Sequence, residues 1–296
     1  MLQIDFINVG YGDAILLRED GLFSMLIDCG TPDTGTDDPA SPRVTTPDFL
    51  RIAGVSRLDL MIVTHLHIDH VGTIDRLARQ TEIAALWTPY LPAPVLWQAD
   101  EARLAPLQRG MKEFLSALTV LGERGCAMRA IDRPEAVRLT DALTLGIDFA
   151  HPYLIARQRA ALDGALSGRP DPRELTLYRR YMNATCPLLT LAYHGKRIVL
   201  PGDAYGHLWD THALSPCYLL KASHHGCADS VTDALLQKLT PEIIVVPVSS
   251  DREDDRPNRA AVACMQRHAG SVRFTDAIAL PGVSEPPHAA LTFVLE

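Results

Sequence analysis

The pattern of apolar and polar positions predicts many short strands separated by a few helices. Period-two alternation and short apolar runs bounded by turn residues indicate strands, whereas apolar positions three or four apart indicate helices. The expected strands occupy residues 2–9, 14–18, 23–27, 58–63, 82–88, 127–131, 136–139, 143–149, 186–193, 197–200, 218–222, 242–248, 271–275 and 290–295. The expected helices occupy residues 47–54, 73–80, 98–124 (with a break at Pro106), 231–239 and 258–268, and residues 31–46 are expected to form a loop.

Polar residues that can serve chemistry recur at the points where these apolar runs end. They are Asp28 after the third strand, His65, His67, Asp69 and His70 after the fourth, Asp203 after residues 197–200, and His224 and His225 after residues 218–222. If the strands lie in two packed sheets, their ends can converge on one edge, where rigid scaffolds place functional groups.

Residues 65–70 concentrate three histidines and one aspartate within six positions. Neutral imidazole and carboxylate are the standard protein ligands of zinc and similar ions. His65 and His67 can point the same way from an extended segment, while Asp69 and His70 turn toward a neighbouring position. This loop can therefore serve two metal ions side by side. A polar surface loop is the alternative, and the density of ligand types beside a buried strand argues against it.

The spacing His-x-His-x-Asp-His resembles the signature of the metallo-β-lactamase fold. The resemblance implies an α/β (α+β) chain folded as a four-layer αβ/βα sandwich that holds one or two metals. It also implies that Asp28 orients the metal loop through hydrogen bonds, as expected around metal ligands. Asp203 then corresponds to the carboxylate that bridges both metals, and one of His224 and His225 corresponds to the last histidine ligand.

A closer resemblance is to the metallo-β-lactamase domain of ComEC-type competence DNA-uptake proteins and related phosphodiesterases. Residues 9–14, Val-Gly-Tyr-Gly-Asp-Ala, look like that group's Val-Gly-x-Gly-Asp-Ala segment. Residues 221–226, Lys-Ala-Ser-His-His-Gly, look like its Leu-Lys-x-x-His-His-Gly segment. The resemblance covers nearly the whole chain except residues 153–181.

Two departures from the superfamily pattern affect the expected site. Most members supply a third histidine to the first metal before the bridging aspartate, whereas this chain offers Asn183, as the ComEC-type group does. Asn183 is expected to bind substrate or a water, and His151 is the other candidate ligand. The group often has Gly-His-Pro before its last helix, whereas this chain has Asp255-Arg256-Pro257. Either Arg256 holds an anionic oxygen in place of that histidine, or the activity of the site is altered.

Composition and charge narrow the class of protein. The chain has 296 residues, of which 47% are hydrophobic and 22% charged, as in an ordinary globular protein, and we expect one domain over residues 1–296. We expect no signal peptide, because the N-terminus lacks a basic start and a long apolar core, and no membrane span, because no apolar stretch approaches the roughly 18 residues required. Six cysteines without a Cys-x-x-Cys pair indicate reduced thiols in a cytoplasmic protein, with Cys29 and Cys227 expected to pack rather than bind metal. The net charge of −8 argues against a broad basic surface that binds nucleic acid, but it does not argue against a phosphate-bearing substrate.

The insertion at residues 153–181 is locally basic in an acidic chain. Six arginines stand against three acids: Arg157, Arg159, Arg169, Arg173, Arg179 and Arg180 against Asp163, Asp171 and Glu174. A solvated helix-loop insertion is one interpretation, since charge runs usually mark solvated faces. A lid whose arginines meet an anionic substrate is the other.

Together these features predict a metal-dependent hydrolase that uses a hydroxide bridging two divalent ions. His65, His67 and Asp203 are expected to hold one ion, and Asp69, His70, Asp203 and one of His224 and His225 the other. Zinc is the expected metal, with manganese and iron as alternatives, and Asp69 is also expected to orient the nucleophile. The resemblance favours a phosphodiester substrate such as a nucleotide or nucleic acid. Hydrolysis of another ester, thioester or lactone, or a non-catalytic metal- or nucleotide-binding accessory role, are the alternatives. No oligomeric state is predicted.

Overall fold

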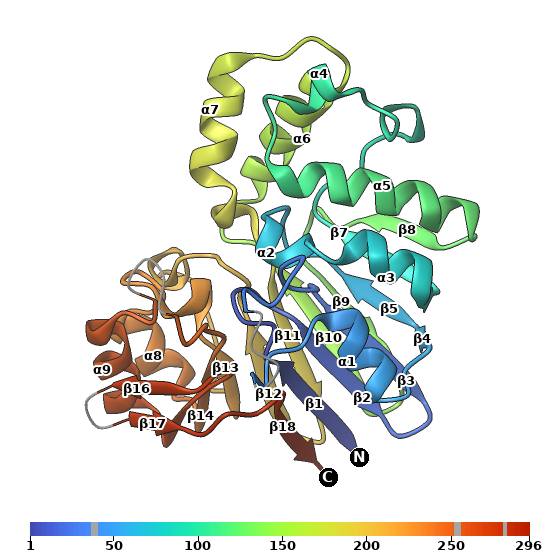
Figure 1. Cartoon of the computed structure of the whole chain (residues 1–296). Coiled ribbons are helices and arrows are strands. Elements are labelled where there is room, and N and C mark those ends of the chain that lie inside the picture. The colour runs from blue at the N-terminus through green and yellow to red at the C-terminus, as the bar shows by residue number, and fades with distance from the viewer. Residues whose placement is uncertain (37–40, 252–255, 281–282) are drawn as a thin grey trace.

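A computed structural model gives the fold of the chain and describes residues 1–36, 41–251, 256–280 and 283–296 (Figure 1). Two β-sheets pack face to face, and helices cover the outer face of each sheet. Residues 37–40 of the expected loop and Asp255 of the Asp-Arg-Pro segment lie outside the described residues.

The first sheet, in the described part of the chain, has the strand order β18-β1-β2-β3-β5-β7-β8. Its strands are β1 (Leu2–Ile7), β2 (Ile15–Glu19), β3 (Phe23–Ile27), β5 (Leu60–Ile62), β7 (Ala85–Thr88), β8 (Ala127–Ala130) and β18 (Ala290–Leu295). The pairs from β18 to β3 are antiparallel, whereas β3, β5, β7 and β8 run parallel. The last strand pairs with the first one along its length, so both ends of the chain lie in one sheet.

The second sheet has the order β15-β14-β13-β12-β11-β10-β9. Its strands are β9 (Glu135–Arg138), β10 (Leu143–Asp148), β11 (Leu188–Tyr193), β12 (Lys196–Leu200), β13 (Leu219–Lys221), β14 (Ile243–Val246) and β15 (Ser271–Phe274). The pairs from β9 to β12 are antiparallel and those from β12 to β15 parallel. Two small pairs, β4 (Arg57–Leu58) with β6 (Glu82–Ile83) and β16 (Ile278–Leu280) with β17 (Val283–Glu285), complete the strands of the described residues.

The apolar faces of the two sheets meet in a central core that includes Phe6, Ile62, Leu145 and Leu191. On the outer face of the first sheet lie α1 (Thr46–Ile52), α3 (Ile74–Gln80) and α5 (Arg109–Glu123), and on that of the second lie α8 (Asp233–Leu239) and α9 (Arg259–His268). These four layers confirm the expected αβ/βα sandwich. None of the helices formed by the described residues combines the length and apolar composition that crossing a membrane requires.

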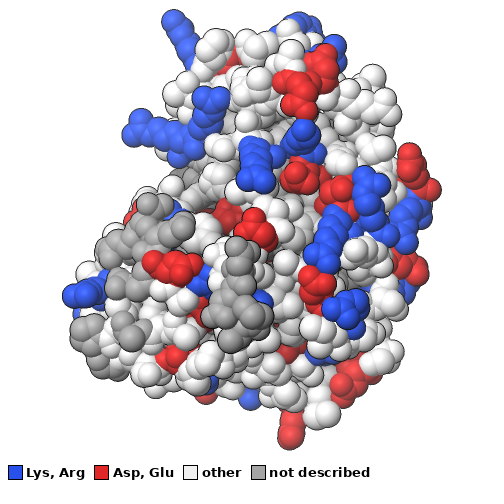
Figure 2. Space-filling view, viewed as in Figure 1, with Lys and Arg blue, Asp and Glu red and all other residues white. Residues whose placement is uncertain are grey.

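The segment at residues 153–181 forms two helices, α6 (Pro152–Leu166) and α7 (Pro172–Tyr181). Their inner faces join the core above the first sheet through Leu162, Leu166 and Leu175. The basic side chains are on the outside: Figure 2 shows Lys and Arg projecting from the upper part of the molecule, where α7 lies in Figure 1. The insertion is therefore packed on one face and basic on the other.

The expected helix at residues 98–124 is broken at Pro106, as predicted, into α4 (Glu101–Leu104) and α5. The expected strand at residues 58–63 is divided between β4 and β5. The prediction that the whole histidine segment is a loop was wrong, because residues 68–71 form a helical turn, α2 (Ile68–Val71). The strands β16 and β17 were not predicted, since three-residue strands carry too little periodicity.

Candidate metal centre

Polar groups from both sheets meet at one edge of the sandwich. Asp28 follows β3, His65 and His67 follow β5, and Asp203 follows β12. His225 lies in the 3₁₀ turn η4 (Ser223–Gly226) that follows β13. The structure therefore brings together strand ends that are separated by up to about 200 positions in the sequence, as the recurrence of polar residues at strand ends had suggested.

Two groups of potential ligand atoms form here, and they share one carboxylate. Asp69, His70, Asp203 and His225 each place one ligand atom within 4.8 Å of the others. His70 Nε2 and His225 Nε2 lie 3.2 and 3.4 Å from Asp203 Oδ2, and His225 Nε2 lies 3.1 Å from Asp69 Oδ2. These short distances describe a buried pocket of nitrogen and oxygen atoms, which is the donor set that zinc-like ions take.

The second group contains His65, His67 and Asp203, again within 4.8 Å. His65 Nε2 lies 2.9 Å from His67 Nδ1 and 3.9 Å from Asp203 Oδ2. Burial lowers the pKa of both imidazoles, and that of His65 falls well below its ordinary value. Both rings are therefore neutral at pH 7, which is the form that binds a metal.

The first group, in contrast, attracts positive charge. Burial alone would lower the pKa of His70 and His225, but Asp203 and neighbouring carboxylates raise both, that of His225 to about 10. Burial would raise the pKa of Asp203, yet the charges of His70 and His225 hold it well below its ordinary value. When no metal is bound, the protons on the His70 and His225 imidazoles offset part of the negative charge of the carboxylates. They do so at the place where a metal cation would fit.

Asp28 positions the imidazoles of both groups. Its Oδ2 accepts hydrogen bonds from His70 Nδ1 (2.8 Å) and from the Thr64 hydroxyl (2.6 Å), and its Oδ1 accepts one from the Thr64 backbone N–H (2.8 Å). Because His70 donates through Nδ1, its Nε2 faces Asp203. The Thr64 hydroxyl, by donating to Asp28, stays able to accept from His65 Nδ1 at 3.1 Å, which leaves His65 Nε2 facing the centre. Asp28 has φ +56°, a left-handed conformation that Asp tolerates better than most residues.

The turn η4 separates the two neighbouring histidines. His224 and His225 have φ values of +45° and +54°, so their rings leave the chain in different directions. His225 enters the first group, whereas His224 contacts Asn183 and lies in a separate cluster with Cys227 and Asp229. The structure thus places His225, and not His224, among the ligand atoms shared with Asp203. Left-handed conformations cost free energy for residues other than glycine and are typical of functional sites.

Two buried residues of the centre had been assigned no role from the sequence. Asp13 forms an ion pair with the Lys221 ammonium, and its Oδ1 lies 3.5 Å from His225 Nδ1. Lys221 Nζ lies 3.5 Å from Asp203 Oδ1 and donates to the Gly202 carbonyl at 2.8 Å. A lysine inside an apolar strand was the available signal, because such a charge is buried only when it is paired.

Asn183 and Arg256 lie at the margin of the centre. Asn183 Nδ2 is 3.3 Å from His224 Nε2, and its Oδ1 is buried without a hydrogen-bond partner among the described residues. The Arg256 guanidinium lies 5.5 Å from the centroid of the Tyr11 ring, whose own centroid is 5.1 Å from that of His225. Arg256 is thus one aromatic ring away from the ligand groups.

His151 and the cysteines lie outside the two proposed ligand groups. His151 lines a neighbouring cavity and joins none of the ligand groups of the described residues. All six cysteines are buried with free thiols. Cys29 donates to the His70 carbonyl, and Cys227 packs against His224 and Asp229.

The buried polar atoms of the centre fit a metal. Asp203 Oδ1 is buried without a hydrogen-bond partner among the described residues, and Asp13 Oδ1 and His225 Nδ1, which also lack one, face each other only at 3.5 Å. Such atoms cost free energy unless something pairs with them. The combination of imidazole nitrogens, carboxylates and unpartnered atoms matches the requirements of a divalent cation.

The fold and the site define a class of protein. Residues 7–151 match the sequence model of the metallo-beta-lactamase superfamily. The chain is therefore a metallo-β-lactamase-fold protein related to the ComEC type, and the resemblance drawn from its sequence is confirmed. Members of this superfamily are mostly metal-dependent hydrolases, and this chain carries groups able to hold divalent metal.

Individual relatives are distant. The chain is 20% identical over 290 residues to ComE operon protein 3 of Bacillus subtilis (strain 168). The aligned region covers 93% of this chain but 32% of that protein, so the chain spans about a third of its relative's length. Among solved structures, YhfI from Bacillus subtilis covers 99% of this chain and 100% of its own at 11% identity, with a TM-score of 0.51. Zn²⁺-bound PqqB from Methylobacterium extorquens covers 100% of both chains at 11% identity, with a TM-score of 0.50. At such identities these structures show a common fold alone.

Proposed function

We propose that this chain is a binuclear metal-dependent hydrolase of phosphodiesters. The observation that carries the proposal is the pair of ligand groups that share Asp203 in a buried centre. His65, His67 and Asp203 would hold one ion, and Asp69, His70, Asp203 and His225 the other. Bound there, two divalent ions supply Lewis acidity and lower the pKa of a water to the range in which it becomes a nucleophile at neutral pH.

The charge of the centre supports two ions rather than one. Four buried carboxylates, those of Asp13, Asp28, Asp69 and Asp203, face one buried ammonium, that of Lys221. The formal excess is three negative charges when the imidazoles are neutral. One divalent ion leaves the centre with one negative charge, whereas two leave one positive charge that a hydroxide nucleophile would neutralise, so an anionic phosphodiester would not be repelled.

The chain's own residues then have separable tasks. Asp28 fixes the ring orientations of His65 and His70, and Lys221 fixes Asp203. Asp69, as the most accessible carboxylate of the first group, orients the attacking water. Asn183 offers an amide to a substrate oxygen at the margin, and Arg256 adds positive charge from beyond Tyr11.

Zinc is the metal we propose, because imidazole and carboxylate suit it and because PqqB, which shares the fold, is described as Zn²⁺-bound. Manganese and iron remain alternatives. The phosphodiester class, with a nucleotide or nucleic acid as substrate, rests on the resemblance of residues 9–14 and 221–226 to the ComEC-type segments and on the basic outer face of α7. We further propose that residues 1–296 act as one domain, since one centre draws on both sheets.

The test is elemental analysis paired with hydrolysis of bis-p-nitrophenyl phosphate, in wild type and Asp203→Ala. We expect about two metals per chain in the wild type, and less than one in Asp203→Ala with hydrolysis reduced about a hundredfold or more. Asp233→Ala is the matched control, because it removes an exposed aspartate from a different Asp-Cys-His group and should retain both metals and activity.

Three outcomes would contradict parts of the proposal. Strong thioester or lactone hydrolysis without phosphodiester hydrolysis would show that the substrate class is wrong, since function depends on the site and not on the fold. Bound metal without turnover of any ester would favour a non-catalytic accessory role, for which the asparagine at position 183 is the motivating feature. A folded chain that takes up neither zinc nor manganese would overturn the metal centre itself.

A further inference from the structure

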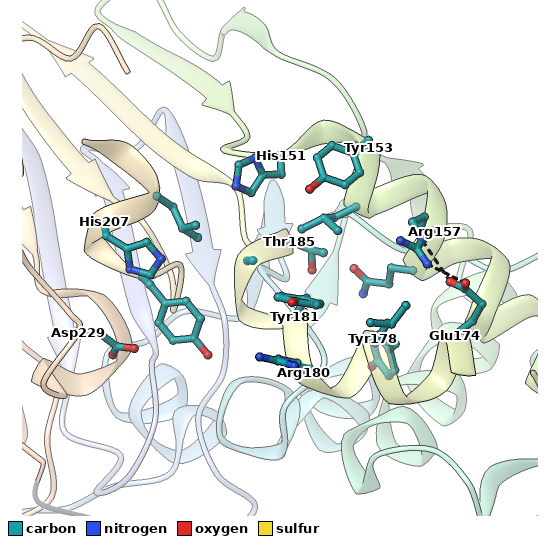
Figure 3. Close-up of a pocket in the computed structure, with 16 residues that line it drawn as sticks. His151, Tyr153, Arg157, Glu174, Tyr178, Arg180, Tyr181, Thr185, His207 and Asp229 are labelled. Atoms are coloured by element: carbon teal, nitrogen blue, oxygen red, sulfur yellow. Dashed lines mark hydrogen bonds and ion pairs between the residues drawn. The ribbon is translucent and has the colours of Figure 1, made fainter. Parts of the chain in front are cut away.

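A cavity of about 660 Å³ is lined partly by residues of the basic insertion (Figure 3). One wall comes from α6, α7 and the short turn η2 (Asn183–Thr185), and the other from η3 (Gly206–Trp209) and Asp229. Aromatic rings dominate the lining: Tyr153, Tyr178, Tyr181 and Tyr205, with the imidazoles of His151 and His207. The basic insertion thus builds half of a pocket.

The cavity adjoins the residues around His224, which is next to the proposed ligand His225. Thr185 lines the cavity two positions after Asn183, whose amide is 3.3 Å from His224 Nε2. The ring centroid of Tyr205, another lining residue, is 5.6 Å from that of His224. The ring centroids of His224 and His225 are 6.1 Å apart, so a molecule whose phosphate is at the proposed metal centre can reach past His224 and place its next group in this cavity.

Unpartnered polar atoms accompany the aromatic lining. Tyr178 and Gln158 are about 95% buried, yet the Tyr178 hydroxyl and Gln158 Oε1 have no hydrogen-bond partner among the described residues. Both residues line the cavity. A ligand that fills it with an apolar chain would leave these atoms unpaired, whereas one with donors and acceptors would satisfy them.

The charges of the lining are uneven. Arg157 and Glu174 neutralise each other in an ion pair of 2.7 Å at the wall. Arg180 has no ion pair with the described residues, and its guanidinium lies 5.5 Å from the centroid of the Tyr181 ring. A guanidinium beside a tyrosine ring is a platform on which flat, anionic ligands stack.

We infer that this cavity binds the nucleoside part of a phosphodiester substrate, with Tyr181 and Tyr205 as stacking surfaces and Arg180 as the positive group. The inference rests on the proposed function, since it assigns the substrate class of the same centre. The volume is in the range that holds a compact ligand, roughly one or two nucleosides. It therefore points to small nucleotides or the frayed end of a strand, and not to the interior of a duplex.

Two phosphodiesters with the same leaving group test the inference: thymidine 5′-(p-nitrophenyl phosphate) and methyl p-nitrophenyl phosphate. They differ only in the presence of the nucleoside. We expect kcat/KM to be about 5- to 150-fold higher for the nucleoside ester, because stacking contributes about 1–3 kcal/mol per base. Tyr181→Ala should reduce this ratio about tenfold, whereas Tyr181→Phe, which keeps the ring, should retain it.

The role of Arg180 is tested with a matched pair of arginine substitutions. Arg180→Ala should lower the ratio, whereas Arg169→Ala, which removes the same charge from the same insertion outside the cavity, should not. Calorimetric titration of adenosine and thymidine monophosphates into chelator-treated protein gives a readout that needs no turnover. Tyr181→Ala should weaken that binding by a similar factor.

The outcomes separate this inference from the proposed function. Hydrolysis of both esters at equal rates, with no nucleotide binding, would overturn the nucleoside pocket and leave the phosphodiesterase in place. Nucleotide binding that depends on Tyr181, without hydrolysis of either ester, would support the pocket and overturn the phosphodiesterase. Binding of a long-chain acyl thioester with no binding of either nucleotide would overturn the pocket's assignment to nucleosides.

Discussion

The substitution Asp28→Asn isolates the part that one carboxylate plays in holding metal. The carboxylate accepts three hydrogen bonds, one from the His70 imidazole and two from Thr64. An amide of the same shape can accept on one side only. Asn also tolerates the φ of +56° at this position, so the backbone need not change.

Each of the two orientations of the amide side chain changes a different hydrogen bond. If its nitrogen replaces Oδ1, it faces the Thr64 backbone N–H, and a buried donor is left unpaired at a cost of about 1–3 kcal/mol. If its nitrogen replaces Oδ2, the Thr64 hydroxyl can rotate to accept, but His70 must accept at Nδ1. The proton of His70 then moves to Nε2, the atom that faces Asp203 and the proposed metal. We therefore expect metal affinity to fall about 10- to 100-fold, which corresponds to about 1.4–2.7 kcal/mol.

The assay is calorimetric titration of zinc into chelator-treated wild type and Asp28→Asn, with far-ultraviolet circular dichroism to confirm the fold. Asp59→Asn is the matched control: Asp59 also accepts from a backbone N–H and a hydroxyl, both of Ser24, but lies outside the ligand groups. It should leave zinc affinity unchanged. Asp28→Asn with wild-type zinc affinity at both sites would refute the role assigned to Asp28.

Two further predictions concern the chain without metal. Because carboxylates raise the pKa of His70 and bring that of His225 to about 10, their protonation stabilises the fold; this stabilisation is complete below the ordinary pKa of 6.5 and is lost as the pH rises through the folded pKa. Urea unfolding in a chelator should therefore give a falling free energy of unfolding between pH 6.5 and pH 10, and a flat profile there would contradict the assignment. Lys221→Met leaves Asp13 and Asp203 without their cation and should destabilise the metal-free chain by about 3–5 kcal/mol. The partly exposed Lys196→Met should cost at most about 1 kcal/mol, and equal losses in both variants would argue against a special role for Lys221.

Sequence reasoning located the strand ends well because each is a local pattern, an apolar run followed by an acid or a histidine. It could not choose between His224 and His225, since both satisfy the same pattern. The choice depends on two consecutive positive φ values, which non-glycine residues rarely adopt and which no local propensity predicts. The helical turn at α2 was missed for a related reason, because four residues are too few to show a helical period.

The buried charges were harder to predict than the ligands. Asp13 and Lys221 are 208 positions apart, and neither belongs to a run of ligand types, so only the folded chain shows that they pair. Asp13 itself depends on Gly12, where a Cβ would lie 2.1 Å from the Asp69 carbonyl oxygen. The lack of a side chain there lets the Asp13 N–H donate to that oxygen at 3.1 Å. Such close backbone approaches leave no trace in hydrophobic periodicity.

The position of the ligand groups at the junction of the two sheets has a consequence for the lifetime of the chain. His65 to His70 come from the first sheet, and Asp203 and His225 from the second, so bound ions would cross-link the halves of the sandwich. Free metal at a thousand times its dissociation constant would add about 4 kcal/mol to the stability of the whole fold. When metal is scarce, the two halves would separate more readily and expose their shared core to proteases. The rate at which the protein is degraded in a cell would then depend on the supply of its metal.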